Sequence, residues 1–160
     1  SPASVAGFVG ASLGGSLSFD YVAEVRARWT GNIVVKGILD PADARRSIDV
    51  GADAVWVSNH GGRQLEASPA AISCLPAIAA EIGDEVPVLF DSGVRSGADI
   101  ARAISLGADF VFAGRPFYFG LGALGADGAG HAYEILHDGL LNVMHQTGCV
   151  RPAELRERTR

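Results

Sequence analysis

Four short apolar segments, each followed by a polar or glycine-rich loop, constrain the fold of this chain more than any other feature. They lie at residues 33–36, 54–58, 86–91 and 110–114, and they are rich in Val, Ile and Phe. Continuous apolar runs of this length, without polar alternation, are typical of parallel strands in a sheet that is covered by helices. The sequence therefore predicts four buried parallel β-strands.

Helical segments separate these strands, and we expect helices over residues 18–29, 40–51, 68–83 and 97–106. Ser18 and Asp40 are residue types whose side chains cap the first turn of a helix, and Pro41 is favourable at a first helical position. Pro76 lies inside the third segment and has no backbone amide hydrogen, so it must kink that helix or split it in two.

An internal repeat supports this alternation. Residues 51–56, Gly-Ala-Asp-Ala-Val-Trp, recur at 107–112 as Gly-Ala-Asp-Phe-Val-Phe. A series of four βα units forms either an open doubly wound sheet or half of an eight-stranded barrel. Polar residues follow all four strands rather than one switch point, which favours an α/β fold of the TIM (β/α)8 barrel type. Because four strands cannot close a barrel, we expect residues outside this chain to cover the seam.

Charge and cysteine content exclude several kinds of partner. The chain carries 13 Lys and Arg against 18 Asp and Glu, a formal net charge of -5, and neither sign is clustered. A nucleic-acid partner is therefore not expected. Cys74 and Cys149 lie in separate segments without metal-ligand spacing, which favours reduced thiols in a cytoplasmic protein and gives no metal site.

The loop after the second strand carries candidate catalytic groups. Residues 58–65 are Ser-Asn-His-Gly-Gly-Arg-Gln-Leu. His60 suits a general base because imidazole titrates near neutral pH, and the guanidinium of Arg63 suits a carboxylate. Taken alone, this loop also fits an ordinary loop histidine beside a solvated arginine. Lys36 places a cation at the end of the first strand, where it either contributes to a site or merely pairs with an acid.

Two later loops have the composition of a phosphate site. Residues 91–97 are Asp-Ser-Gly-Val-Arg-Ser-Gly, and residues 114–116 are Gly-Arg-Pro. Gly93 and Gly114 leave backbone amides accessible, and each loop adds an arginine near a helix N-terminus. Phosphate sites after the last two strands recur in TIM barrels. The alternative is a pair of capped helices with surface arginines.

Together these motifs resemble the FMN-dependent (S)-2-hydroxy-acid dehydrogenases and oxidases, which include glycolate oxidase, flavocytochrome lactate dehydrogenase and mandelate dehydrogenase. The resemblance runs from about Ser18 to the C-terminus and rests on residues 34–37 (Val-Val-Lys-Gly), 58–65, 91–99 and 114–116. It implies an FMN-binding TIM barrel of which residues 16–160 supply the last four βα units.

The resemblance also implies roles for single residues. Lys36 matches a lysine beside the N1 and O2 edge of the flavin, and Ser58 matches a second flavin contact. His60 matches the active-site base, and Arg63 matches the residue that binds the substrate carboxylate. Five further positions match those that hold the ribityl chain and the phosphate: Asp91, Gly93, Arg95, Gly114 and Arg115.

The implied reaction is oxidation of a small (S)-2-hydroxy acid, mandelate-, lactate- or glycolate-like, to the 2-keto acid. His60 takes a proton from the substrate while two electrons pass to the flavin; the sequence leaves open whether that proton comes from carbon or from the hydroxyl. It also leaves open whether oxygen, a quinone or a cytochrome accepts the electrons. The alternatives are a non-catalytic half-barrel that binds FMN and another phosphate-binding barrel enzyme, although residues 60–64 argue against the latter.

The chain departs from the family pattern in two respects. It has Asp91-Ser92-Gly93 where Asp-Gly-Gly is common, a substitution associated with mandelate-type members. The first four strands lie outside it, so we expect the N-terminal half of the barrel as a second polypeptide. Residues 1–15 resemble the tail of the long mobile loop after strand four, in which some relatives carry a membrane anchor. By analogy we expect a tetramer, in the cytoplasm or associated with a membrane.

Six other conspicuous side chains are assigned to packing, capping or the solvated surface. They are Trp56, Asp99, His131, His137, Met144 and His145, of which the three histidines and Met144 belong to an expected C-terminal helix.

Overall fold

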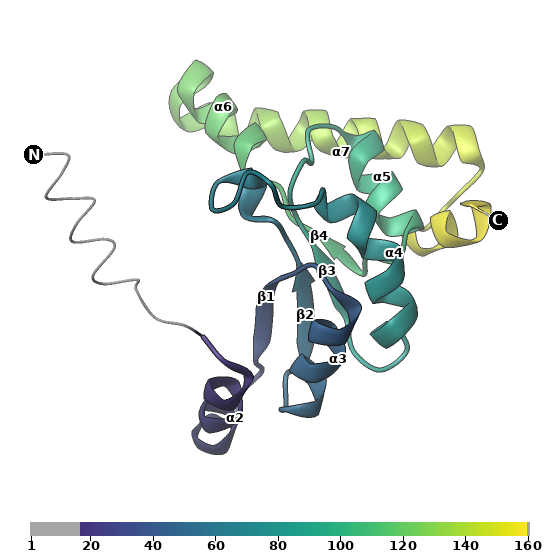
Figure 1. Cartoon of the computed structure of the whole chain (residues 1–160). Helices are drawn as coiled ribbons and strands as arrows, with labels where there is room; N and C mark the ends of the chain where they lie inside the picture. Colours follow the sequence, from purple (N-terminus) through teal and green to yellow (C-terminus); the bar gives the residue numbers. More distant parts are fainter. Residues whose placement is uncertain (1–16, 160) are drawn as a thin grey trace, which may run out of the picture.

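The computed structural model describes residues 17–159. Its centre is one parallel sheet whose four strands follow one another in chain order (Figure 1). The strands are β1 (Val34–Ile38), β2 (Ala54–Val57), β3 (Val88–Phe90) and β4 (Phe110–Val111). All four predicted strands are confirmed, with shifted ends.

Helices separate successive strands, because parallel neighbours need a crossover connection. The helices are α2 (Phe19–Arg28), α3 (Pro41–Asp49), α4 (Ala71–Ile82), α5 (Gly97–Ser105), α6 (Arg115–Leu124) and α7 (Gly128–Thr147). Three 3₁₀ helices complete the chain: η1 (His60–Gly62), η2 (Gly125–Asp127) and η3 (Pro152–Thr159). Helix α6 begins at the helix N-terminus expected beside residues 114–116, although its extent was not predicted.

The predicted caps of the first two helices are confirmed. Ser18 Oγ accepts a hydrogen bond from the Tyr21 amide at 3.2 Å, at the start of α2. Asp40 Oδ1 accepts one from the Ala42 amide at 2.8 Å, and Pro41 is the first residue of α3. These side chains satisfy amides that have no partner inside the helix.

Helix α4 differs from its prediction in two ways. It begins at Ala71 rather than near Ser68, and it continues through Pro76 as one helix, so of the two predicted outcomes, a kink or a split, the split does not occur. Pro76 removes one amide hydrogen bond. Leu75 and Ile78 on either side of it are fully buried in the core, and their burial holds both turns against the sheet.

Strand β1 extends beyond its predicted end. It runs to Ile38, so Lys36 and Gly37 lie inside the strand rather than after it. The pairing register with β2 shifts between Lys36 and Ile38, and Gly37 has φ 98°. A glycine in this left-handed region allows a bulge, which bends the strand without ending it.

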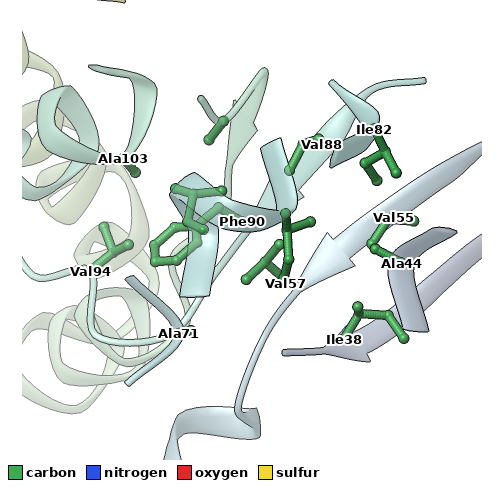
Figure 2. Packing of buried hydrophobic residues seen from close by; sticks show 13 residues of the cluster. Ile38, Ala44, Val55, Val57, Ala71, Ile82, Val88, Phe90, Val94 and Ala103 are labelled. Carbon is green, nitrogen blue, oxygen red and sulfur yellow. The ribbon is translucent and has the colours of Figure 1, made fainter. Parts of the chain in front are cut away.

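The core lies between the sheet and helices α3, α4 and α5 (Figure 2). Its side chains from β2 and β3 are fully or almost fully buried, at 2% exposure or less: Val55, Val57, Val88 and Phe90. They pack on apolar residues of the three helices, which include Ala44, Leu75, Ile78, Ile82 and Ala103. Each large side chain buried in this way stabilises the fold by about 1.5–3 kcal/mol.

The opposite face of the sheet is more exposed. Lys36, Trp56, Leu89 and Phe110 stand in register across the four strands. On this row Phe110 is 57% exposed, and Val34 on β1 is 44% exposed. Parallel sheets are usually covered on both faces, so apolar side chains at this level of exposure indicate a surface that another element covers.

The internal repeat has one structural role in both copies. Asp53 Oδ2 accepts a hydrogen bond from the Ile33 amide at 2.7 Å, and Asp109 Oδ2 accepts one from the Val88 amide at 2.7 Å. Each aspartate therefore secures the amino end of the preceding strand. The predicted meaning of the repeat, a βα unit that occurs twice, is confirmed.

Three further points concern the cysteines, membrane-spanning helices and residues 1–15. Cys74 and Cys149 are both free thiols, and Cys149 is buried. Within residues 17–159, no helix has the length and apolar character needed to cross a membrane. The expected loop tail at residues 1–15 lies outside the described residues.

Candidate active site

The carboxyl ends of the strands open into a cavity of about 580 Å³. This volume lies in the range of small-molecule and cofactor sites. All the predicted site residues except Ser58 line it: Lys36, His60, Arg63, Asp91, Gly93, Arg95, Gly114 and Arg115. Ser58 is completely buried and is hydrogen-bonded to this lining. Residues that are far apart in the sequence thus meet around one space.

Lys36 is held by three groups. Its Nζ donates hydrogen bonds to Asp91 Oδ2 at 2.7 Å and to Ser58 Oγ at 2.8 Å. The same ammonium lies 4.6 Å from the ring centroid of Trp56, within the range of a cation–π contact. Lys36 therefore pairs with an acid, the plainer of its two sequence interpretations, and also lines the cavity.

Asp91 is the anion of this pair. Partial burial raises the pKa of its carboxyl group. Hydrogen bonds with Lys36, Ser58 and Ser92 together lower this pKa by more than burial raises it, so the pKa lies below its ordinary value. Asp91 is consequently ionised near neutral pH and balances the charge of Lys36 at the edge of the sheet.

His60 begins the turn η1 in a left-handed conformation, with φ 55°. Its backbone amide donates to Ser58 Oγ at 3.1 Å. Gly37 on β1 makes room for the imidazole, because a Cβ added there would lie 2.9 Å from His60 Nε2. No group within residues 17–159 hydrogen-bonds to the imidazole, which is exposed and lines the cavity. The ring is thus available to a ligand.

Three arginines give the cavity a positive wall. Arg63, Arg95 and Arg115 line it, and none of them pairs with a carboxylate of residues 17–159. Arg95 donates to the Val94 carbonyl at 2.9 Å, and Arg115 donates to the Gly61 carbonyl at 2.7 Å. The guanidinium groups are therefore available to bind an anionic ligand.

The N-terminus of α6 offers backbone donors beside these arginines. Gly114 precedes the helix, and no side chain in the described part of the chain caps its first turn. Open space lies where a Cβ would stand on Gly114 and on Gly93, so a ligand can approach both backbones. Uncapped helical amides and arginines together are suited to a phosphate group.

Three aromatic residues that line the cavity were not predicted to belong to the site: Trp56, Phe112 and Tyr118. Trp56 is assigned to packing from the sequence, yet it lines the cavity and stacks on Phe112 with 4.0 Å between ring centroids. Its Nε1 is a buried donor without a partner among the described residues. The signal was available, because Trp56 and Phe112 are the final residues of the two copies of the internal repeat.

The remaining assigned residues lie outside the cavity lining. Asp99 forms a capping box with Ser96 at the start of α5, which confirms capping, and Met144 is buried, which confirms packing. The three histidines, His131, His137 and His145, are exposed on α7.

The fold and the cavity define a class: an α/β domain with a phosphate-type site and a histidine–arginine loop at the carboxyl edge of a parallel sheet. The family model "FMN-dependent dehydrogenase" matches residues 1–159. The chain belongs to this family, which confirms the resemblance drawn from its motifs and, with it, FMN as the family's cofactor.

Curated relatives are considerably longer than this chain. It is 42% identical over 149 residues to an L-lactate dehydrogenase from Pseudomonas aeruginosa, a match that covers 93% of this chain and 39% of the relative. It is 44% identical over 133 residues to an FMN-dependent alpha-hydroxy acid dehydrogenase from Schizosaccharomyces pombe. This match covers 82% of this chain and 33% of the relative. The chain spans less than half of either relative.

Solved structures agree with the sequence relatives. A lactate oxidase from Pediococcus acidilactici superimposes with a TM-score of 0.84 at 39% identity, over 89% of this chain and 40% of the oxidase. A mandelate oxidase with benzoyl-formic acid superimposes with a TM-score of 0.84 at 39% identity, over 89% of this chain and 42% of the oxidase. The parallel α/β fold is therefore similar to part of these TIM-barrel oxidases.

Proposed function

We propose that this chain supplies the flavin- and substrate-binding face of an enzyme that oxidises a small (S)-2-hydroxy acid to the 2-keto acid. Mandelate-, lactate- and glycolate-like acids are the candidate substrates. The observation that carries the proposal is the shared cavity, in which His60 and Arg63 on one loop meet the Lys36–Asp91 pair and an uncapped helix N-terminus.

The residues present fit FMN. The open backbones at Gly93 and Gly114, together with Arg95 and Arg115, are suited to the phosphate. Asp91 is an ionised acceptor suited to the hydroxyls of the ribityl chain. When bound, FMN supplies the acceptor for two electrons.

Lys36 and Ser58 would lie at the flavin ring. Because Lys36 is held on Ser58 and Asp91, its ammonium is fixed before a ligand arrives. A fixed positive charge at the edge of the ring favours the electron-rich, reduced form.

Two side chains act on the substrate. Arg63 has no carboxylate partner of its own in the described chain, and its guanidinium can bind the substrate carboxylate through two parallel hydrogen bonds. This contact brings the hydroxyl-bearing carbon toward His60, whose imidazole takes a proton from the substrate. The proton comes either from that carbon or from its hydroxyl.

We further propose that residues 16–160 are the last four βα units of a TIM barrel and that a second polypeptide supplies the first four. The exposed face with Val34 and Phe110 supports this, as does the short span relative to the family. Residues 1–15 would be the tail of the connecting loop. By analogy with the family, we propose a tetramer that lies in the cytoplasm or is anchored to a membrane through a segment outside this chain.

The proposal is tested with the purified protein, including the half that completes the barrel. We expect a flavin spectrum, loss of its visible absorbance when lactate, glycolate or mandelate is added without oxygen, and formation of the matching 2-keto acid. A bound flavin that none of these acids reduces would instead support the non-catalytic FMN-binding alternative.

A further inference from the structure

Ser92 stands in a backbone conformation that favours glycine. Its φ is 82°, and His60 is the other non-glycine residue with positive φ among residues 17–159. A side chain in this region costs conformational energy that glycine avoids. A serine that is kept there needs a compensating contact, and its hydroxyl provides several.

The Ser92 hydroxyl connects two loops. Its Oγ accepts hydrogen bonds from the backbone amides of Asn59 and Gly61, both at 3.2 Å. It donates to Asp91 Oδ1 at 2.8 Å and lies 3.4 Å from Ser58 Oγ. The two amides belong to the residues immediately before and after His60, so one side chain from the loop after β3 holds both flanks of the histidine.

Other elements fix the same turn on its remaining sides. Gly37 on β1 leaves the space that the His60 ring occupies. Arg115 at the start of α6 binds the Gly61 carbonyl, and Asn59 Nδ2 donates to the Pro69 carbonyl before α4. Ser92 differs from these contacts because it alone among them binds the amides on both sides of His60.

We infer that Ser92 is a positioning residue for the proposed oxidation. Its hydroxyl fixes the backbone of residues 59–61 and so sets the orientation from which His60 meets the substrate. This inference rests on the proposed function for its kinetic consequence, whereas the hold on the turn is a property of the structure itself. Misplacement of a catalytic group by about 1 Å lowers the reaction rate even when the substrate still binds.

Two substitutions separate the hydroxyl from the backbone strain. Ser92→Gly removes both the hydroxyl and the strain, whereas Ser92→Ala removes the hydroxyl and keeps the strain. A merely structural role predicts that the rate follows stability, with the glycine variant as fast as the wild type. A positioning role predicts that both variants lose rate equally while the glycine variant unfolds at the higher temperature.

The experiment uses the FMN-loaded protein with both barrel halves present. We expect flavin reduction per bound FMN to fall about tenfold in both variants, with little change in KM. Hydrogen exchange at the Asn59 amide should become about tenfold faster in both, whereas the Gly61 amide keeps a second acceptor, Asn59 Oδ1 at 3.1 Å. Ser18→Ala, which removes a serine hydroxyl from a helix cap far from the cavity, serves as the matched control and should change neither quantity.

Exchange at the wild-type rate at the Asn59 amide in both variants would overturn the inference, as would reduction rates that follow stability instead of the hydroxyl. Failure of the proposed function is recognised separately, because the wild-type flavin would then not be reduced by any 2-hydroxy acid. In that case the exchange measurement alone decides whether Ser92 positions the turn.

Discussion

The two ends of the sheet use similar side chains for different purposes. At the amino ends, Asp53 and Asp109 each bind the amide of a strand start and an arginine, Arg26 at 2.9 Å and Arg156 at 2.8 Å. At the carboxyl ends, the ion pair of Lys36 and Asp91 lies beside cavity-lining arginines that have no carboxylate partner within residues 17–159. The amino-end arrangement recurs with the internal repeat, whereas the carboxyl-end residues differ from loop to loop.

This difference indicates how the fold separates stability from chemistry. The repeated Gly-Ala-Asp turn serves the same structural need twice, so the same residues meet it twice. The arginines reinforce it, since Arg156 also binds the Gly107 carbonyl and Arg26 binds the Gly51 carbonyl. Substitutions at the amino ends should therefore alter stability alone, whereas substitutions at the carboxyl ends should alter reaction rates, with or without a change in stability.

The largest expected effect is that of His60→Ala. Removal of the proposed base should lower the rate of flavin reduction by about 10³-fold, while FMN content and the unfolding temperature stay close to the wild type. Rapid mixing with substrate in the absence of oxygen measures this rate. His145→Ala on α7 is the matched control and should retain the full rate; a fully active His60→Ala protein would remove His60 from the mechanism.

Arg63→Gln should act mainly on substrate binding. Loss of a charged, two-bonded contact to the carboxylate should raise KM about 100-fold. Arg63→Lys keeps the charge but not the planar fork, so we expect an intermediate rise of about tenfold. Steady-state kinetics with the same acid gives both values. Equal KM values in all three proteins would assign the carboxylate to another group.

Substitution of Asp53 or Asp109 at the amino ends of the strands should affect stability alone. Asp109→Ala leaves the amide of the fully buried Val88 without an acceptor, and we expect the free energy of unfolding to fall by about 1–3 kcal/mol. Asp53→Ala should cost less, because Ile33 is only half-buried. Urea unfolding measures both. A loss of flavin reduction per folded molecule comparable to that of His60→Ala would contradict the separation of the two ends.

The smallest expected effect is a change in acid stability at Asp91. The folded-state pKa of Asp91 lies below its ordinary value of 3.8, so its contribution to stability is fully present above the unfolded pKa. That contribution is lost as the pH falls through the folded pKa. When the pH is lowered from neutral to below about 4, Asp91→Asn should therefore lose less of its stability than the wild type loses. Unfolding midpoints at neutral and acid pH test this, and identical acid losses would contradict it.

Local signals explain why much of the fold could be predicted. Apolar runs, the caps at Ser18 and Asp40 and the repeated turn each depend on residues close together in sequence. The extent of helix α6 was not predicted because glycine is a poor helix former, whereas here Gly120 is needed for contact. A Cβ on Gly128 of α7 would lie 1.9 Å from the Gly120 carbonyl oxygen, so the close crossing requires both glycines.

The members of the candidate site could be predicted, but their connections could not. The motif residues stood out by type and order, and the cavity gathers them. Ser92 looked like a minor departure, because its partners Asn59 and Gly61 lie more than thirty residues earlier in the chain. The acid that pairs with Lys36 was likewise undetermined until the fold brought Asp91 to it.

The central claim is that the carboxyl edge of this sheet oxidises a 2-hydroxy acid with FMN. The most direct measurement mixes the complete, FMN-loaded protein with (S)- and with (R)-mandelate or lactate in the absence of oxygen, and follows flavin absorbance and 2-keto acid together. We predict that the (S)-acid bleaches the flavin and yields one 2-keto acid per flavin reduced, and that Arg63→Gln needs far more acid to do so. A flavin that stays oxidised with both enantiomers of both acids would contradict the account.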